Sequence, residues 1–219
     1  MAIGYGGDSN VSSILVVGAT GGLGLQIVSQ ALAGGLQVTA LVRNAAALPH
    51  SDHLKVVTGN IFDPQLVRTA MEGTDAVLSA LGFKRKSKHP TIYSNSLQVL
   101  LPAMTATGVR KIIYCTSAGV EDNDPNTLWV YRHVVRPLVL KKGYADMVKA
   151  EALLRQSSAD WVVIRPGRLT DGERKGQFRV SPRFRPTHGV TISRADVAYF
   201  MLQQVDSVQW VRQTPTLTY

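Results

Sequence analysis

The chain has 219 residues, one cysteine and a formal net charge of +9, and 45% of its residues are hydrophobic. This composition fits one globular domain with a full core. It excludes an internal disulfide and a multi-cysteine metal site, and no segment is apolar for long enough to cross a bilayer. We therefore expect a cytoplasmic protein with no metal and no membrane partner, whose positive charge favours anionic ligands.

The first part of the chain predicts strands and helices in alternation. Residues 1–12 are Gly-rich and typical of a flexible leader, without the basic and apolar regions of a signal peptide. An apolar run at 14–19 predicts a strand buried on both faces, and the spacing of Leu23, Ile27 and Ala31 predicts a helix directly after it. Further strands are expected at 36–43, 54–60 and 75–82.

Helices are expected between these strands and after them. Asp63 and Pro64 form a cap and first-turn pair that opens a helix. A long helix follows residues 75–82 and ends at Gly108, and a further strand is expected at 110–119.

The second part continues the alternation with one interruption. Residues 121–143 are less regular, and a helix is expected from about residue 145 to 156. A strand at 160–167 follows, and Ser193 with Asp196 resembles a capping pair at the start of a last helix. The final residues, TPTLTY, predict a short strand.

This alternation predicts an α/β fold, a Rossmann-like doubly wound parallel sheet in a single domain over residues 13–219. Three segments depart from the rhythm, at 82–90, 119–143 and 168–188, and each follows the carboxyl end of a strand. Open α/β sheets bind ligands at that edge, so we expect these loops to form the substrate site.

Three glycines connect the first strand to the first helix. Gly18, Gly21 and Gly24 follow the spacing GxxGxxG, which meets the GxGxxG dinucleotide motif only loosely. Glycine allows a tight turn, close approach of the backbone to a pyrophosphate, and packing of the helix on the strand. A plain strand-to-helix turn is the alternative, and no Lys-Ser/Thr pair follows that would indicate a P-loop.

The end of the second strand indicates which dinucleotide is bound. An NAD-binding protein has an acidic residue there for the ribose hydroxyls, whereas this chain has Arg43. An arginine pairs with a 2′-phosphate, so the sequence favours NADP(H), with an ordinary surface arginine as the alternative. Asp63 is placed to contact adenine, to cap its helix, or both.

Together these segments resemble a known family. The motifs GATGGLG, LVRN, GNIFDP, SALG, YCTSAGV and VIRPGRLTDG are similar to those of the atypical short-chain dehydrogenase/reductase group with NAD(P)-binding, NmrA-like domains. Within that group the sequence looks most like the small biliverdin-IXβ reductase/flavin reductase type. The resemblance runs from about Ser13 to the C-terminus, and relatives of this small type often act as monomers.

The resemblance implies a role for particular residues. Ser117 would stand near the nicotinamide and the substrate as the catalytic residue. The implied cofactor contacts are Gly18, Thr20, Gly21, Gly22 and Leu23 at the pyrophosphate, Arg43 at the 2′-phosphate, Ile61 and Asp63 at adenine, Ala80, Leu81 and Gly82 along the nicotinamide, and Pro166 and Gly167 at the carboxamide.

One departure from dehydrogenase chemistry is the Tyr-x-x-x-Lys acid/base pair. The near match here is Tyr144 and Lys149, one residue too far apart. In a helix four steps leave two side chains about 40° apart, whereas five place them about 140° apart. We therefore expect Tyr144 either to pack or to cap the helix from a position at or before its start, and we keep Lys149 as a contact to the cofactor ribose.

Without that pair, the sequence favours hydride transfer to a conjugated acceptor, which we expect to be anionic: a flavin, a biliverdin-like tetrapyrrole or a quinone. Ser117 would donate a hydrogen bond, unless the backbone satisfies it. Candidate substrate residues are Phe83, Trp129, Arg174 and Phe178, with Lys84, Arg85 and Arg179 as further anion partners. Satellite packing and solvated loops are the alternatives.

A second hypothesis is a non-catalytic NADP(H)-binding redox sensor or assembly factor, which the missing Tyr–Lys pair fits equally well. Nucleic-acid binding is disfavoured, because the sequence contains no recognised module and no basic stripe along a helix. A nucleotide-sugar epimerase or dehydratase would need the Tyr–Lys pair and a larger substrate region.

Overall fold

The computed structural model of the protein describes residues 12–82, 91–126 and 141–219. An eight-stranded sheet with the order β3-β2-β1-β4-β5-β6-β10-β8 forms its centre. The pairs from β3 through β6 to β10 are parallel, and β8 runs antiparallel to β10. The strands are β1 (Ser13–Val17), β2 (Gln37–Val42), β3 (Leu54–Thr58), β4 (Ala76–Ser79), β5 (Lys111–Cys115), β6 (Asp160–Pro166), β8 (Arg179–Ser181) and β10 (Thr216–Thr218).

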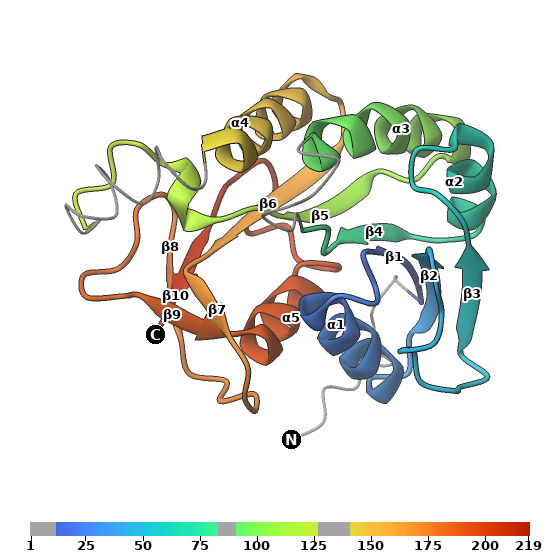
Figure 1. Cartoon of the computed structure of the whole chain (residues 1–219), viewed down its shortest axis with the longest axis horizontal. Helices are drawn as coiled ribbons and strands as arrows, with labels where there is room; N and C mark the ends of the chain where they lie inside the picture. The colour runs from blue at the N-terminus through green and yellow to red at the C-terminus, as the bar shows by residue number, and fades with distance from the viewer. Residues whose placement is uncertain (1–11, 83–90, 127–140) are drawn as a thin grey trace.

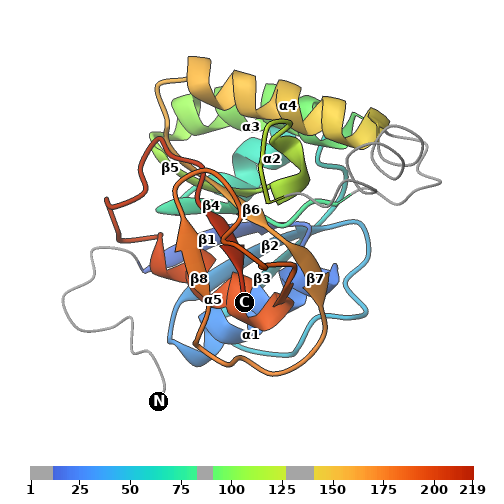
Figure 2. The ribbon, with the colours of Figure 1, turned by 90° about the vertical axis from the view of Figure 1, so that its left-hand side faces the viewer.

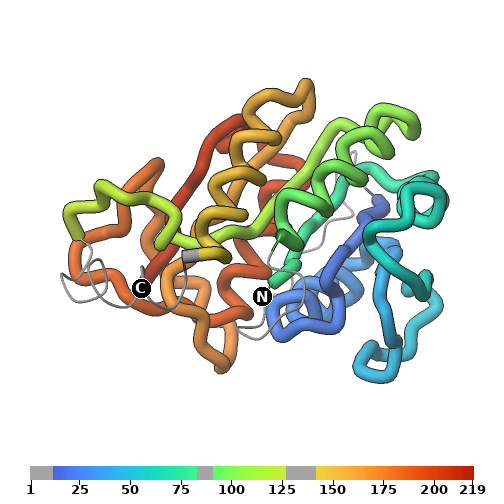
Figure 3. The backbone as a smooth tube through the Cα atoms, turned by 45° about the horizontal axis from the view of Figure 1, so that its top comes forward, coloured from blue at the N-terminus to red at the C-terminus, as the bar shows by residue number. Residues whose placement is uncertain are grey.

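Helices cover both faces of this sheet (Figures 1 and 2). One face carries α2 (Pro64–Met71), α3 (Ile92–Thr107) and α4 (Lys141–Gln156), and Figure 3 shows α3 and α4 side by side. The other face carries α1 (Gly22–Ala33) and α5 (Arg194–Gln203). This three-layer arrangement confirms the α/β, doubly wound fold that the alternation predicts.

The first strand shows why the sheet is buried on both faces. Ile14 and Val16 pack in the core beneath α1 and α5, whereas Leu15 and Val17 pack beneath α2, α3 and α4. All four side chains are at most 1% exposed. A continuous apolar run is what such a strand requires, since successive side chains point to opposite faces.

Two expectations about the second half of the chain were wrong. The helix expected from residue 145 begins at Lys141, so Tyr144 lies inside α4; the packing of α4 on the sheet outweighs the poor helix propensity of Gly143. The segment 168–188, expected to be a loop, contains β7 (Arg168–Thr170) and β8. β7 pairs with β9 (Thr191–Ser193) in a separate two-stranded sheet. Three-residue strands are too short to show alternation and depend on distant partners.

The last helix and the last strand match the prediction. The Ser193 hydroxyl accepts a hydrogen bond from the Asp196 amide (3.0 Å) and caps α5. The final residues form β10, which lies between β6 and β8. In the part of the chain that the structure describes, every helix is too short or too polar to cross a bilayer.

The strand order decides where a ligand can bind. The chain passes from β1 outward to β2 and β3, and then returns to β4 on the other side of β1. Because β1 to β6 are parallel, their carboxyl ends share one edge, and the order reverses there between β1 and β4. The predicted cofactor residues that follow β1, β2, β3, β4, β5 and β6 are therefore gathered at this edge.

Candidate functional site

The loop after β1 touches the loop after β4 at the point where the strand order reverses. Gly18 has a φ of +78°, and a Cβ atom there would lie 2.7 Å from the carbonyl carbon of Ala80 and 2.9 Å from the amide nitrogen of Leu81. Both the left-handed backbone and the close approach require glycine. The loop predicted to contact the pyrophosphate therefore approaches the loop predicted to contact the nicotinamide, and the two loops are closest at Gly18 and Ala80.

The N-terminus of α1 is open to an anion. Its N-cap, Gly21, supplies no side-chain hydrogen bond, and its first turn contains no acidic residue. The other helix starts for which the structure describes the cap have an oxygen ligand: Asp63 caps α2, Ser193 caps α5, and the Asp146 carboxylate accepts a hydrogen bond from the Tyr93 amide of α3 (2.8 Å). Uncapped amides and the helix dipole suit a pyrophosphate, so the residues of this loop fit the group.

On the side of the site predicted to take adenine, Arg43 is an exposed cation. Arg43 directly follows β2, and it makes no ion pair with the residues that the structure describes. Asp63 caps α2, accepting hydrogen bonds from the amides of Gln65 and Leu66 (3.0 and 3.1 Å), and remains exposed. Ile61 is half-buried against the core on the α2 side. The arrangement leaves the contacts of Arg43, Ile61 and Asp63 with a nucleotide as predictions.

The side of the site predicted to take the nicotinamide contains a hydroxyl after β5 and a tight connection after β6. Ser117 caps a short 3-10 helix, η1 (Ala118–Val120), by accepting a hydrogen bond from the Gly119 amide (3.2 Å). A hydroxyl that accepts one bond still has its own proton to donate. Pro166 ends β6, and Gly167 donates its amide hydrogen to the Leu217 carbonyl of β10 (2.9 Å).

The helix α4 separates Tyr144 from Lys149. The Tyr144 ring is 8% exposed, and its hydroxyl end lies against Gly119, where an added Cβ would be 3.0 Å from Cε1 of the ring. Lys149 lies on the exposed face of the same helix. The two side chains thus lie on different faces of α4, and their spacing is not that of the acid/base pair of a short-chain dehydrogenase.

A buried ion-pair cluster involves the residues that directly precede Ser117 and Pro166. Arg165, which precedes Pro166, bonds Glu151 of α4 through Nε (3.0 Å) and Nη2 (2.5 Å), and bonds Glu121 through Nη1 (3.1 Å). Thr116, which precedes Ser117, donates to Glu151 (3.0 Å). The cluster joins the ends of β5 and β6 to α4. The cluster was not predicted from the sequence, although a charged residue within the apolar run VVIRPG indicates a buried, paired group.

The cluster continues outward to the segment after β8. Arg183 bonds the second oxygen of Glu121 (3.2 Å), and Arg185 bonds Asp124 (2.8 Å). Two of the basic residues in the 168–188 segment thus hold it against residues 121–126, which is a structural use of their charge.

The remaining predicted substrate residues differ in their surroundings. Phe83 and Trp129, with Lys84 and Arg85, lie outside the described residues. The Arg174 guanidinium lies over the Tyr199 ring (4.9 Å). Phe178 packs edge-on against Tyr199 and Phe200 of α5, with centroid distances of 6.4 and 5.9 Å. The described contacts of Arg174 and Phe178 are with α5, and their contact with an acceptor stays a prediction.

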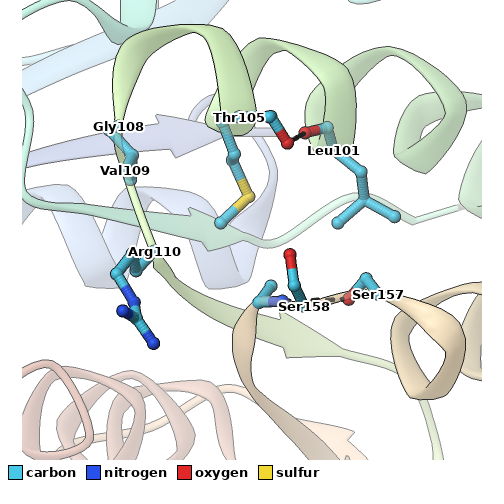
Figure 4. A pocket seen from close by; sticks show the side chains of 9 residues that line it. Leu101, Thr105, Gly108, Val109, Arg110, Ser157 and Ser158 are labelled. Carbon is cyan, nitrogen blue, oxygen red and sulfur yellow. Dashed lines mark hydrogen bonds between the residues drawn. The ribbon is translucent and has the colours of Figure 1, made fainter.

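A pocket of about 390 Å³ lies elsewhere, between the C-terminal ends of α3 and α4 (Figure 4). Leu101 and Met104 line it from α3, and Arg110 and Ser158 line it from the segments that lead into β5 and β6. These are the amino ends of the strands, at the opposite edge of the sheet from Ser117. Of the predicted site residues within 12–82, 91–126 and 141–219, none lines this pocket.

We expect the contribution of the Glu121 carboxylate to the free energy of unfolding to depend on pH. Burial alone would raise its pKa, but hydrogen bonds from Arg183 and Arg165, and their charges, outweigh burial and hold the pKa below its ordinary value. A carboxyl whose pKa is depressed on folding stabilises the native state above its ordinary pKa, and this contribution is lost as pH falls through the native pKa. We expect Glu121→Gln to lower the free energy of unfolding at pH 7 and to flatten its fall below about pH 4.5.

Urea unfolding at pH 7, 5 and 4 measures this effect. Glu72→Gln, at the exposed C-terminal cap of α2, is the matched control and should follow the wild type. Equal acid sensitivity of Glu121→Gln and wild type would remove Glu121 from this role.

Comparison with known proteins is consistent with this geometry. Residues 18–207 match a family model described as NAD(P)H-binding. Reductase pytE of Aspergillus terreus is 25% identical over 266 residues, covering 97% of this chain and 100% of the relative. Photosystem II assembly factor Ycf39 of Synechocystis sp. is 36% identical over 107 residues, covering 46% of this chain and 32% of the relative. The chain thus spans only about a third of that assembly factor's length.

Two solved structures share the fold over nearly the whole chain. A short-chain dehydrogenase/reductase from Veillonella parvula, solved in complex with NADP, has a TM-score of 0.80 and 15% identity, covering 95% of each chain. ChuY, an anaerobillin reductase from Escherichia coli O157:H7, has a TM-score of 0.74 and 23% identity, covering 94% of this chain and 97% of ChuY.

Proposed function

Because the chain belongs to the NAD(P)H-binding family, we propose that it is a cytoplasmic NADPH-dependent reductase that passes hydride to a conjugated acceptor: a flavin, a biliverdin-like tetrapyrrole or a quinone. The observation that carries this proposal is the uncapped N-terminus of α1 at the edge where the strand order reverses. The separation of Tyr144 from Lys149 favours a conjugated acceptor over alcohol dehydrogenation. Such acceptors take hydride at a conjugated centre, and their proton can come from water or a weak donor. A paired Tyr–Lys acid is therefore not needed.

The residues at this edge have separate roles in the proposed reaction. When bound, NADPH supplies the hydride. The uncapped amides of α1 hold the pyrophosphate and Arg43 binds the 2′-phosphate. The Ser117 hydroxyl donates a hydrogen bond to the acceptor, and residues 80–82 after β4 lie along the nicotinamide. The Arg165–Glu151–Glu121 cluster keeps Ser117 and Pro166 at a constant separation, because it joins the residues that precede them.

The first test is NADPH oxidation by the purified chain, followed by absorbance, with FMN, a biliverdin and a quinone offered in turn. Turnover of any acceptor, faster with NADPH than with NADH, is the expected result. Tight NADPH binding without turnover of any of them would contradict the reductase proposal.

That second result would favour a non-catalytic NADP(H)-binding redox sensor or assembly factor. The similarity to Photosystem II assembly factor Ycf39 is the observation that supports this alternative. The two functions differ in turnover and not in nucleotide binding, so an acceptor assay separates them.

Ser117→Ala should lower kcat about five- to tenfold and leave the Kd for NADPH within about twofold, because one neutral hydrogen bond to the acceptor is lost.

Tyr144→Phe should change kcat by less than about threefold, since the phenol is not activated by Lys149. Steady-state kinetics and fluorescence titration of NADPH measure both parameters.

Ser157→Ala, at the opposite edge of the sheet, is the matched control for the loss of a hydroxyl. An unchanged kcat for Ser117→Ala would leave Ser117 with only its capping role. A collapse of kcat in Tyr144→Phe would identify the phenol as the proton donor.

A further inference from the structure

A cation from the last helix reaches the first residue of α1. Arg194 begins α5, and its side chain lies across Gly22: a Cβ atom on Gly22 would be 2.9 Å from Cδ and 3.0 Å from Nε of Arg194. The guanidinium is thus beside the uncapped first turn of α1, where the backbone amides face the edge of the sheet. The sequence predicts no role for Arg194, because nothing in its own segment indicates that it reaches Gly22.

The packing of α5 on α1 fixes this approach. The side-chain amide of Gln30 in α1 (Nε2) donates a hydrogen bond to the Ala195 carbonyl (2.9 Å), and the two helices lie together on one face of the sheet (Figure 1). The start of α5 is therefore anchored on α1, and the Arg194 side chain extends from that anchor toward Gly22. Its position follows from the packing of the two helices.

The present partner of Arg194 is an exposed carboxylate. Nη1 of Arg194 lies 2.7 Å from Oδ1 of Asp171, with side-chain exposures of 28% and 94% respectively. Ion pairs with so exposed a partner contribute little to stability, so the guanidinium can exchange Asp171 for another anion. A phosphate, with more charge and more acceptor oxygens, competes well with one solvated carboxylate.

The segment that carries Asp171 is anchored to the same helix. Asp196 of α5 accepts hydrogen bonds from the amides of Lys175 (3.2 Å) and Gly176 (2.8 Å). Burial would raise the pKa of Asp196, but these amides and the hydroxyls of Tyr219 and Ser193 outweigh burial and hold the pKa below its ordinary value, so the carboxylate stays charged at neutral pH. The residues after β7 therefore remain close to Arg194 while its guanidinium exchanges partners.

We propose that Arg194 is a binding residue for the cofactor pyrophosphate, and that Asp171 is the partner from which it is released. The α1 amides contact the phosphates along the helix axis, and the guanidinium contacts them from the side of α5. Gly22 then has a second purpose, since any side chain there would displace the stem of Arg194. This inference rests on the binding of NADP(H) by the chain and not on its turnover.

The test is a fluorescence titration of NADPH and NADH with the full chain and three variants. Arg194→Met should raise the Kd of both nucleotides about tenfold or more, since both contain the pyrophosphate and a charge-assisted contact is lost. Arg194→Lys should recover part of this loss, because the charge is kept without the fork geometry. Asp171→Asn should bind both nucleotides as tightly as the wild type or up to about threefold more tightly, because the competing anion is gone.

Binding of the nucleotide fragment 2′-AMP distinguishes the contact of Arg194 with the pyrophosphate from the contact of Arg43 with the 2′-phosphate. The nucleotide 2′-AMP has the 2′-phosphate but no pyrophosphate, so Arg194→Met should bind it as the wild type does, as judged by its competition with NADPH. Melting curves without ligand verify that the variants fold.

The remaining outcomes would overturn the proposal. Parallel weakening in Arg194→Met and Asp171→Asn would mean that the ion pair only supports the structure, and an unchanged Kd in Arg194→Met would mean that the guanidinium does not reach the phosphates. Failure of the wild type to reduce any acceptor would overturn the reductase proposal and leave these binding results intact.

Discussion

Glu151→Ala should lower the free energy of unfolding by about 3–5 kcal/mol, the expected effect of breaking a buried ion pair from one side. Glu151 is 1% exposed, and its two oxygens accept hydrogen bonds from Thr116, Arg155 and Arg165. Removal of the carboxylate leaves the buried Arg165 with Glu121 as its remaining acidic partner. The loss of charge compensation, and not the loss of packing volume, dominates the effect.

Urea unfolding at pH 7, read by far-UV circular dichroism, measures this loss. Glu72→Ala is the exposed control and should change the free energy of unfolding by less than about 0.5 kcal/mol. The double variant Glu151→Leu/Arg165→Met should recover much of the stability, since apolar groups of similar size can replace a buried pair. A loss below about 1 kcal/mol for Glu151→Ala would show that water or Glu121 compensates Arg165.

Arg43→Ala should weaken NADPH binding by about 10- to 100-fold and NADH binding by less than about threefold. The guanidinium follows β2 and is exposed, so it is available to pair with a 2′-phosphate that only NADPH carries. The effect is electrostatic, and higher salt should reduce the preference of the wild type for NADPH.

Fluorescence titration with both nucleotides measures the preference. Arg68→Ala, an exposed arginine in the last turn of α2, controls for the loss of one positive charge and should leave the ratio of the two affinities unchanged. Equal loss for NADPH and NADH in Arg43→Ala would contradict the assignment of the 2′-phosphate to Arg43. Together with Arg194→Met, this variant divides cofactor affinity between its two phosphate groups.

The parts of the site that were predictable are those whose signals are local in sequence. The apolar run before Gly18 and the helical pattern after it place the glycine loop between β1 and α1. Arg43, Asp63 and Ser117 follow expected strands, so the prediction of a parallel sheet already places them at one edge. The boundaries of α4 were less predictable, because Gly143 is a poor helix former whose effect is overcome by packing.

The sequence by itself determined the fold, the edge of the sheet at which we expect the cofactor and the absence of a correctly spaced Tyr–Lys pair. These features depend on periodicity and on spacing between near neighbours, and such patterns are visible along the chain. The tertiary structure alone decided that Arg194 lies on Gly22, that Tyr144 lies against Gly119, and that Glu151 neutralises Arg165. Each of these contacts joins different elements, and its geometry follows from how helices and strands pack, which no local pattern specifies.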